Sequence, residues 1–148
     1  MVTGLTATNY TFVASAGTLN ITKPALTVGV HGMPVSKTYG AANPTFTASY
    51  ARFVKGDTAS VITGTPTFTT TAVTSSPAGV YAVTPVVTGL WATNYTFLGS
   101  AGSLNIIAAQ LTVTANSVNK AHGAVNPALT YTITGFQGTD TQANSTTA

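Results

Sequence analysis

The sequence predicts a mostly β fold: a small antiparallel β-sandwich or a β-grasp-like repeat domain, with at most one short helix near residues 57–63. Three observations predict it. Apolar and polar residues alternate with a period of two in many short segments, which is the pattern of half-buried strands. Turns that contain glycine or proline separate these segments. A long internal repeat runs through the chain, which is typical of tandem arrays of one folded unit.

The alternating segments give the expected strands in chain order. In each strand, apolar side chains of one parity should face a core while threonines of the other parity face water. By this parity Tyr10 is also expected in a core. The other expected core-facing residues are Phe46, Ala48 and Tyr50; Phe68; Tyr81 and Val83; Tyr95 and Phe97; Leu104 and Ile106; Leu111, Val113 and Ala115; and Leu129, Tyr131 and Ile133.

Turn residues bound these strands. The Asn–Pro pairs at 43–44 and 126–127 disfavour helix before them and indicate corners. The sequence SSPAG at 75–79 predicts the loop of a hairpin between the strands around Phe68 and Tyr81. Gly102 predicts a bulge or a sharp bend at the last strand of the unit.

One segment, GDTASVITG at residues 56–64, predicts a helical turn. Asp57 is expected to cap its N-terminus and Gly64 to end it. A helix of this length has only one or two turns and depends on packing for its stability.

The internal repeat has an offset of 85 residues, because residues 2–28 return as residues 87–113 with 19 of 27 positions identical. Further on, YGAANP at 39–44 matches HGAVNP at 122–127 with an offset of 83. Two residues have therefore been lost near residues 31–35. Loop tips tolerate deletions, so a turn is expected there.

This repeat frame predicts residues 24–107 as one complete repeat domain. Residues 1–23 would then be the C-terminal strands of a preceding, incomplete repeat, and residues 108–148 the N-terminal strands of a following, incomplete repeat. Such a frame indicates a fragment of a longer array. The alternative is that the two incomplete pieces complement each other, within a chain or between chains. Together they lack the counterpart of residues 64–85, so a complete domain would not result.

Composition excludes several classes of function. Charged residues make up 5% of the chain, and 31 threonines provide polar surface instead. The five basic residues are scattered, so no nucleic-acid partner is expected. No apolar run approaches the length of a membrane span. Cysteine is absent, so disulfides and thiol chemistry are excluded.

The side chains suited to catalysis or metal binding are too few. General acid–base catalysis usually needs two neighbouring carboxylates, whereas the only acidic residues, Asp57 and Asp140, are copies of one repeat position. His31 and His122 are isolated, and no cluster of His, Cys or acidic residues suggests a metal site. We therefore expect a protein that is not an enzyme and that uses no cofactor or metal.

Trp91 is the one candidate ligand contact. Its repeat counterpart is Thr6, and a position that accepts both residues is expected to be exposed. An exposed tryptophan can stack on a sugar or insert into a partner. The alternative is that Trp91 packs on a neighbouring domain or on its own sheet.

Six motifs occur in order along the chain: LTV at 26–28, YGAANP at 39–44, FVKGDT at 53–58, GVY at 79–81, LWATNYTF at 90–97 and GSLNI at 102–106. Together, these motifs resemble the MBG/YDG-type tandem repeats of large bacterial surface adhesins, which are haemagglutinin-like exported proteins. The resemblance covers essentially the whole chain and implies no catalytic residues. His122 departs from it, because it stands where a tyrosine like Tyr39 would be expected; this leaves the position a packing or turn role.

The resemblance implies an extracellular or cell-surface protein built of many repeats. We expect a structural or adhesive repeat that acts as a stalk or spacer. Its expected partners are the neighbouring repeats of the same chain and host or surface glycans or proteins. The alternative is a carbohydrate-binding accessory module of an exported enzyme.

Overall fold

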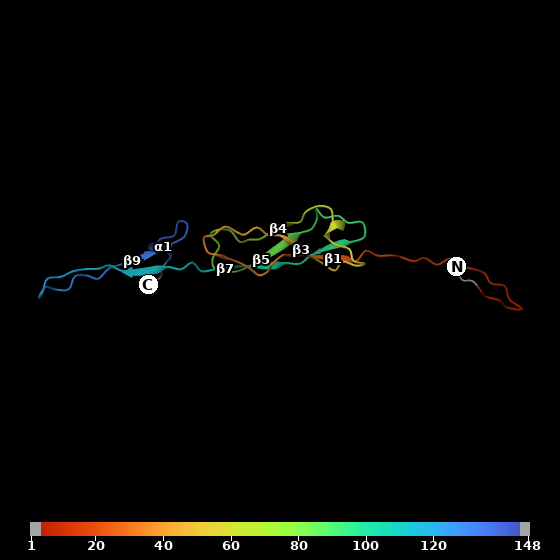
Figure 1. The fold of residues 1–148 in the computed structure, drawn as a ribbon, viewed down its shortest axis with the longest axis horizontal. Helices are drawn as coiled ribbons and strands as arrows, with labels where there is room; N and C mark the ends of the chain where they lie inside the picture. Colours follow the sequence, from red (N-terminus) through yellow and green to blue (C-terminus); the bar gives the residue numbers. More distant parts are fainter. Residues whose placement is uncertain (1–3, 146–148) are drawn as a thin grey trace.

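The protein is elongated and has three parts along its length (Figure 1). The structure, a computed structural model, describes residues 4–145. Residues 25–107 form a two-sheet β unit, here called the central unit. Residues 108–145, the C-terminal unit, lie at one end of it, and residues 4–24, the N-terminal segment, extend from the opposite end without forming a strand.

The central unit contains two small sheets. The first has the order β3–β1–β6 and consists of β1 (Ala25–Val30), β3 (Ala48–Ala51) and β6 (Thr96–Gly99). The second has the order β2–β7–β5–β4 and consists of β2 (Val35–Thr38), β7 (Gly102–Ile107), β5 (Gly79–Val86) and β4 (Thr67–Thr69). The predicted mostly β class is confirmed, and the arrangement is consistent with a sandwich-like domain.

Two of the pairings are parallel, β1 with β6 and β2 with β7, and the sequence pattern does not reveal them. They arise because one long stretch, residues 25–38, runs beside another, residues 96–107. Each stretch bends once, at residues 31–34 and at residues 100–101, and so passes from the first sheet to the second. The turn expected at 31–35 is confirmed. Gly102 is the first residue of β7, and a Cβ atom there would meet the Met33 side chain at 2.5 Å, so this position favours a residue without a side chain.

The alternation of apolar and polar residues in the sequence matches an alternation of buried and exposed side chains in the strands. In β1, the side chains of Leu26, Val28 and Val30 are buried, whereas the intervening residues are partly exposed. Strands β4 and β5 pair as the expected antiparallel hairpin. The core divides into two clusters. One contains Val30, Ala72, Val83, Leu104 and Ile106 and the other contains Leu26, Ala92 and Tyr95, with partly buried aromatic residues packed against both.

The predicted helical turn is present but shorter, as the 3-10 helix η1 (Ala59–Val61). Its N-cap is Thr58, whose side chain accepts from the Ser60 amide, so the expectation that Asp57 is the cap is wrong. Asp57 instead accepts a hydrogen bond from Tyr95. Within residues 4–145, no helix is long and apolar enough to cross a membrane.

The C-terminal unit repeats the opening elements of the central unit. Strands β8 (Thr112–Ala115) and β9 (Tyr131–Thr134) pair as β1 and β3 do, and α1 (Gln142–Ser145) follows at the position of η1. Its apolar side chains are more exposed than those of the central unit. Tyr131 is 53% exposed, and Tyr10 in the N-terminal segment is 81% exposed. The expectation that these two tyrosines lie in a core is therefore wrong, because the strands that would cover them are absent beside them.

Candidate functional site: the junction between the two β units

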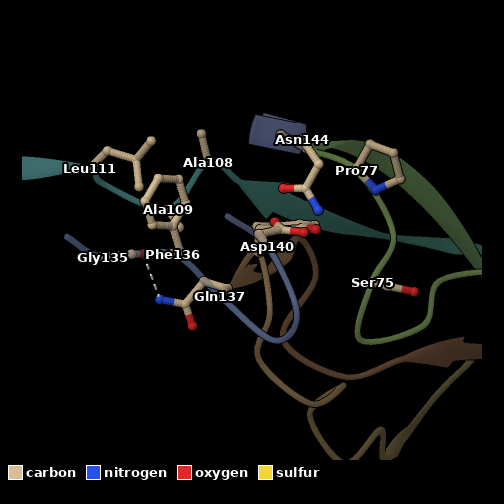
Figure 2. A pocket seen from close by; sticks show the side chains of 12 residues that line it. Ser75, Pro77, Ala108, Ala109, Leu111, Gly135, Phe136, Gln137, Asp140 and Asn144 are labelled. Carbon is tan, nitrogen blue, oxygen red and sulfur yellow. Dashed lines mark hydrogen bonds between the residues drawn. The ribbon is translucent and has the colours of Figure 1, made fainter. Parts of the chain in front are cut away.

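The central and C-terminal units meet at a cavity of about 400 Å³. Figure 2 shows Ser75 and Pro77 of the central unit on one side of it and Phe136, Gln137 and Asp140 of the C-terminal unit on the other. The short linker at residues 108–111 closes a further side. The cavity therefore belongs to the junction and not to either unit alone.

A tyrosine and a carboxylate from different units meet at this junction. Tyr39, which directly follows β2, and Asp140 of the C-terminal unit both line the cavity. Hydrogen bonding with Asp140, then partial burial and the negative charge of the carboxylate, raise the pKa of Tyr39 above its ordinary value of 10.0. Tyr39 therefore lies at the contact between the units as well as beside the turn at Gly40.

The neighbouring glycine allows the two units to approach closely. Gly40 has a φ of +84°, which favours glycine. A Cβ atom on Gly40 would lie 2.6 Å from Cβ of Gln137. A side chain at residue 40 would therefore both strain the turn and push the C-terminal unit away.

The opposite end of the central unit has the counterpart of this carboxylate. Tyr95 donates its hydroxyl to Oδ2 of Asp57 at 2.6 Å, and the same hydroxyl accepts from the Val54 amide at 3.1 Å. The hydrogen bond to Asp57 is the largest of the effects that raise the pKa of Tyr95. Beside this pair lies an open cavity of about 450 Å³, which Lys23 and Pro24 also line.

A buried lysine holds the Tyr–Gly turn in place. The side chain of Lys37 is 7% exposed, and its ammonium group donates to the carbonyls of Ala41 at 3.0 Å and Val73 at 2.8 Å. Its counterpart in the C-terminal unit, Lys120, donates to the carbonyl of Ala124, which corresponds to Ala41. Sequence reasoning missed this lysine, although its recurrence at the same offset of 83 as the turn gave the signal.

The side chain of Trp91 is 62% exposed, so the expected exposure is confirmed. The backbone of Trp91 exchanges two hydrogen bonds with Thr63 in an isolated bridge, which fixes the backbone from which the indole projects. Trp91 does not line the junction cavity or the cavity near Asp57. The structure therefore does not bring Trp91 together with the other polar residues of interest.

The two acidic residues have structural partners. Asp57 accepts from Tyr95 within the central unit, and Asp140 of the C-terminal unit lies beside Tyr39 of the central unit. Across residues 4–145, no group of three or more His, Cys, Asp or Glu side chains could hold a metal ion. His31 and His122 are both exposed and far apart in the chain. The arrangement can join units.

Comparison with known families adds one finding. The family model described as MBG domain, YGX type, matches residues 24–105 and again residues 111–148. No curated protein and no solved structure matches the chain. The two matches cover well over half of the sequence, and Tyr39–Gly40 supplies a Tyr-Gly pair within the first. The chain belongs to the MBG domain family of the YGX type.

Proposed function

We propose that the chain is a non-catalytic structural repeat of an exported bacterial surface protein, and that it acts as a stalk or spacer. Membership of the MBG family supports a repeat domain of surface proteins. The observation that carries the proposal is the junction, where Tyr39 of one unit and Asp140 of the next line one cavity and Gly40 lies against Gln137. A repeat that binds its successor end to end extends a protein in one direction.

In this proposal, residues 24–107 form one complete repeat and the flanks belong to the adjacent repeats. The cavity beside Asp57 is the place where a preceding repeat would insert its Tyr–Gly turn, as Tyr39 and Gly40 do beside Asp140. Neighbouring repeats of the same chain are then the main partners. Host or surface glycans or proteins would be further partners of the assembled array.

An extracellular or cell-surface location fits the chemistry of the chain. Only seven side chains, five basic and two acidic, carry a formal charge, and threonine hydroxyls provide polar surface in their place. A chain without cysteine is independent of the redox state of its compartment. These properties support export without identifying its route.

Distance measurement between the units tests the spacer role. Because the chain has no cysteine, spin labels can be placed on Val80→Cys and Thr114→Cys alone. A spacer predicts a narrow distance distribution between the two labels in electron paramagnetic resonance. Asp140→Asn weakens the charge-assisted junction bond and should broaden the distribution, whereas His31→Asn, which lies outside the junction, should not. A broad distribution in the unmodified junction would contradict the proposal.

The exposed Trp91 favours a second candidate, a carbohydrate-binding accessory module of an exported enzyme. An indole held on a rigid bridge is a suitable stacking platform for a sugar ring. A spacer predicts that Trp91→Ala leaves binding to glycans and cells unchanged. A binding module predicts that this substitution abolishes binding, while Leu98→Ala, which removes another exposed apolar side chain of the same unit, preserves it.

A further inference from the structure

The outer edge of β8 is open. Strand β8 pairs with β9 on one side only, in a sheet of two strands. In the described part of the chain, no strand pairs with its other edge. Several apolar side chains are exposed around this edge: Val113, Val118, Leu129 and Tyr131. An open edge that carries apolar side chains is a template for a further strand.

The central unit shows which strand such an edge binds. Strand β1 is the counterpart of β8, and it lies between β3, the counterpart of β9, and β6. Strand β6 runs parallel to β1, with Leu26 beside Phe97 and Val28 beside Gly99. The Ser100 amide donates to the Val28 carbonyl at 2.8 Å, so this carbonyl points towards β6. The equivalent carbonyl in β8 is that of Val113.

The N-terminal segment carries the sequence of β6 and β7. Residues 2–21 match residues 87–106 at 16 of 20 positions, including NYTF at 9–12 and LNI at 19–21. The segment forms no strand, and its large apolar side chains are exposed: Leu5, Tyr10, Phe12, Val13, Leu19 and Ile21. It thus has the sequence of a strand pair without the partner strands.

We propose that the outer edge of β8 binds residues 5–22 of a second copy of this chain by strand addition. The register follows from the central unit. Phe12 of the second copy lies beside Leu111, and Leu19 lies beside Val118, as Phe97 lies beside Leu26 and Leu104 beside Val35. The docked segment rebuilds the sheet β3–β1–β6 from two molecules.

The docked segment also rebuilds one core cluster and its polar bond. In the central unit, Leu26, Ala92 and Tyr95 pack together with Phe53 and Phe97. The equivalent residues are Leu111 and Phe136 of one copy with Ala7, Tyr10 and Phe12 of the other. The Tyr10 hydroxyl then donates to Asp140 as the Tyr95 hydroxyl donates to Asp57. Asp140 has two carboxylate oxygens, so it can accept from Tyr10 and from Tyr39 together.

Chain connectivity requires that the partner be a separate molecule. In the docked register, Thr22 lies beside Ala121, because Ile107 lies beside Thr38 in the central unit. Residue 121 belongs to the C-terminal unit, whereas Pro24 directly precedes β1 at the opposite end of the central unit (Figure 1). The single residue between Thr22 and Pro24 cannot span the length of that unit.

The same connectivity makes assembly open-ended. Each copy donates its N-terminal segment and offers its own β8 edge, so the contact is head to tail and does not close on itself. Because the docked segment comes from a separate molecule, the binding is concentration-dependent. The strand-addition proposal depends on the repeat geometry and not on export or adhesion. If the chain proved to be monomeric, the spacer proposal would therefore be unaffected.

Sedimentation velocity of the 148-residue chain over a concentration series tests the proposal. We expect the weight-average mass to rise from 14.9 kDa with concentration, through a series of oligomers. Phe12→Asp removes the donor by placing a charge in the rebuilt cluster, and Val113→Pro removes the acceptor by capping the open edge. Each variant alone should stay monomeric. A one-to-one mixture should form dimers only, because one donor and one acceptor remain functional.

Two further variants make the test specific. Val80→Asp removes another exposed apolar side chain, outside both surfaces, and should associate as the unmodified chain does. Tyr10→Phe should weaken association by about tenfold, because it removes one charge-assisted hydrogen bond. A chain that stays monomeric to about 1 mM, at which only weaker binding would escape detection, overturns the proposal. So does a mixture of the two single variants that remains monomeric, or association that survives Phe12→Asp.

Discussion

Leu104→Ala gives the sharpest test of the core, because the chain contains a matched control. Leu104 is 0% exposed and packs in the cluster that includes Val83 and Ile106, whereas its repeat counterpart, Leu19, is 87% exposed. The substitution removes three carbon atoms at about 0.8 kcal/mol each, or about 2.4 kcal/mol of lost burial. Incomplete collapse of the resulting cavity raises the cost to about 3 kcal/mol. Leu19→Ala should change stability by less than about 0.5 kcal/mol.

Urea unfolding followed by far-ultraviolet circular dichroism measures both variants, and the single Trp91 gives an independent signal from the central unit. At about 4–8 °C per kcal/mol for a unit of this size, Leu104→Ala should also lower Tm by about 12 °C or more. Both variants should be measured at low protein concentration, where the chain is monomeric. Leu19 is then not buried by association between copies. A cost of Leu104→Ala below about 1 kcal/mol, or an equal cost for Leu19→Ala, would refute the reasoning.

Three other substitutions have equally direct readouts. Lys37→Met removes a buried ammonium group and the part-buried hydrogen bonds that it donates to two carbonyls, and it should cost about 2 kcal/mol in urea unfolding. Lys120→Met, at an exposed copy of the position, should cost less than about 0.5 kcal/mol. The folded pKa of Tyr95 lies above 10.0, so its contribution to stability is complete below pH 10.0 and is lost as pH rises through the folded pKa. Phenolate absorbance and unfolding at alkaline pH measure this loss, and Tyr95→Phe should abolish it. Gly64→Ala should prevent folding of the central unit, because φ is +95° and a side chain would collide with a backbone carbonyl; Gly56→Ala, at a similar φ in open space, should cost only about 1 kcal/mol in the same assay.

The strands of the central unit could be predicted because burial follows the side-chain period. Leu26, Val28 and Val30 alternate in the sequence and alternate in burial. Strand direction could not be predicted in this way, since alternation is the same for parallel and antiparallel neighbours. The parallel pairs β1–β6 and β2–β7 depend on which distant segments meet, and a single chain's pattern carries no such information.

The wrong predictions arose because the sequence does not show which distant residues or strands contact a given residue. The local structural preferences were predicted correctly. Tyr10 and Tyr131 have the parity of core residues, yet they are exposed because their covering strands are not beside them. Asp57 and Thr58 are both residue types that favour the N-cap of a helix. Thr58 is the cap in the structure, because Asp57 accepts a hydrogen bond from Tyr95, 38 positions away in the sequence. The junction was equally hidden, because the contact between Tyr39 and Asp140 forms only when two units are placed end to end.

The parallel pairing of β1 with β6 and of β2 with β7 determines how the central unit responds to tension. Residues 25–38 and 96–107 lie side by side and run in the same direction. A force that pulls the chain at residue 25 and at residue 107 draws these two stretches past each other along their length. Shear of this kind loads the inter-strand hydrogen bonds together, whereas an antiparallel hairpin pulled at its ends would open one bond at a time. The topology therefore suits a molecule that must stay folded while it is stretched.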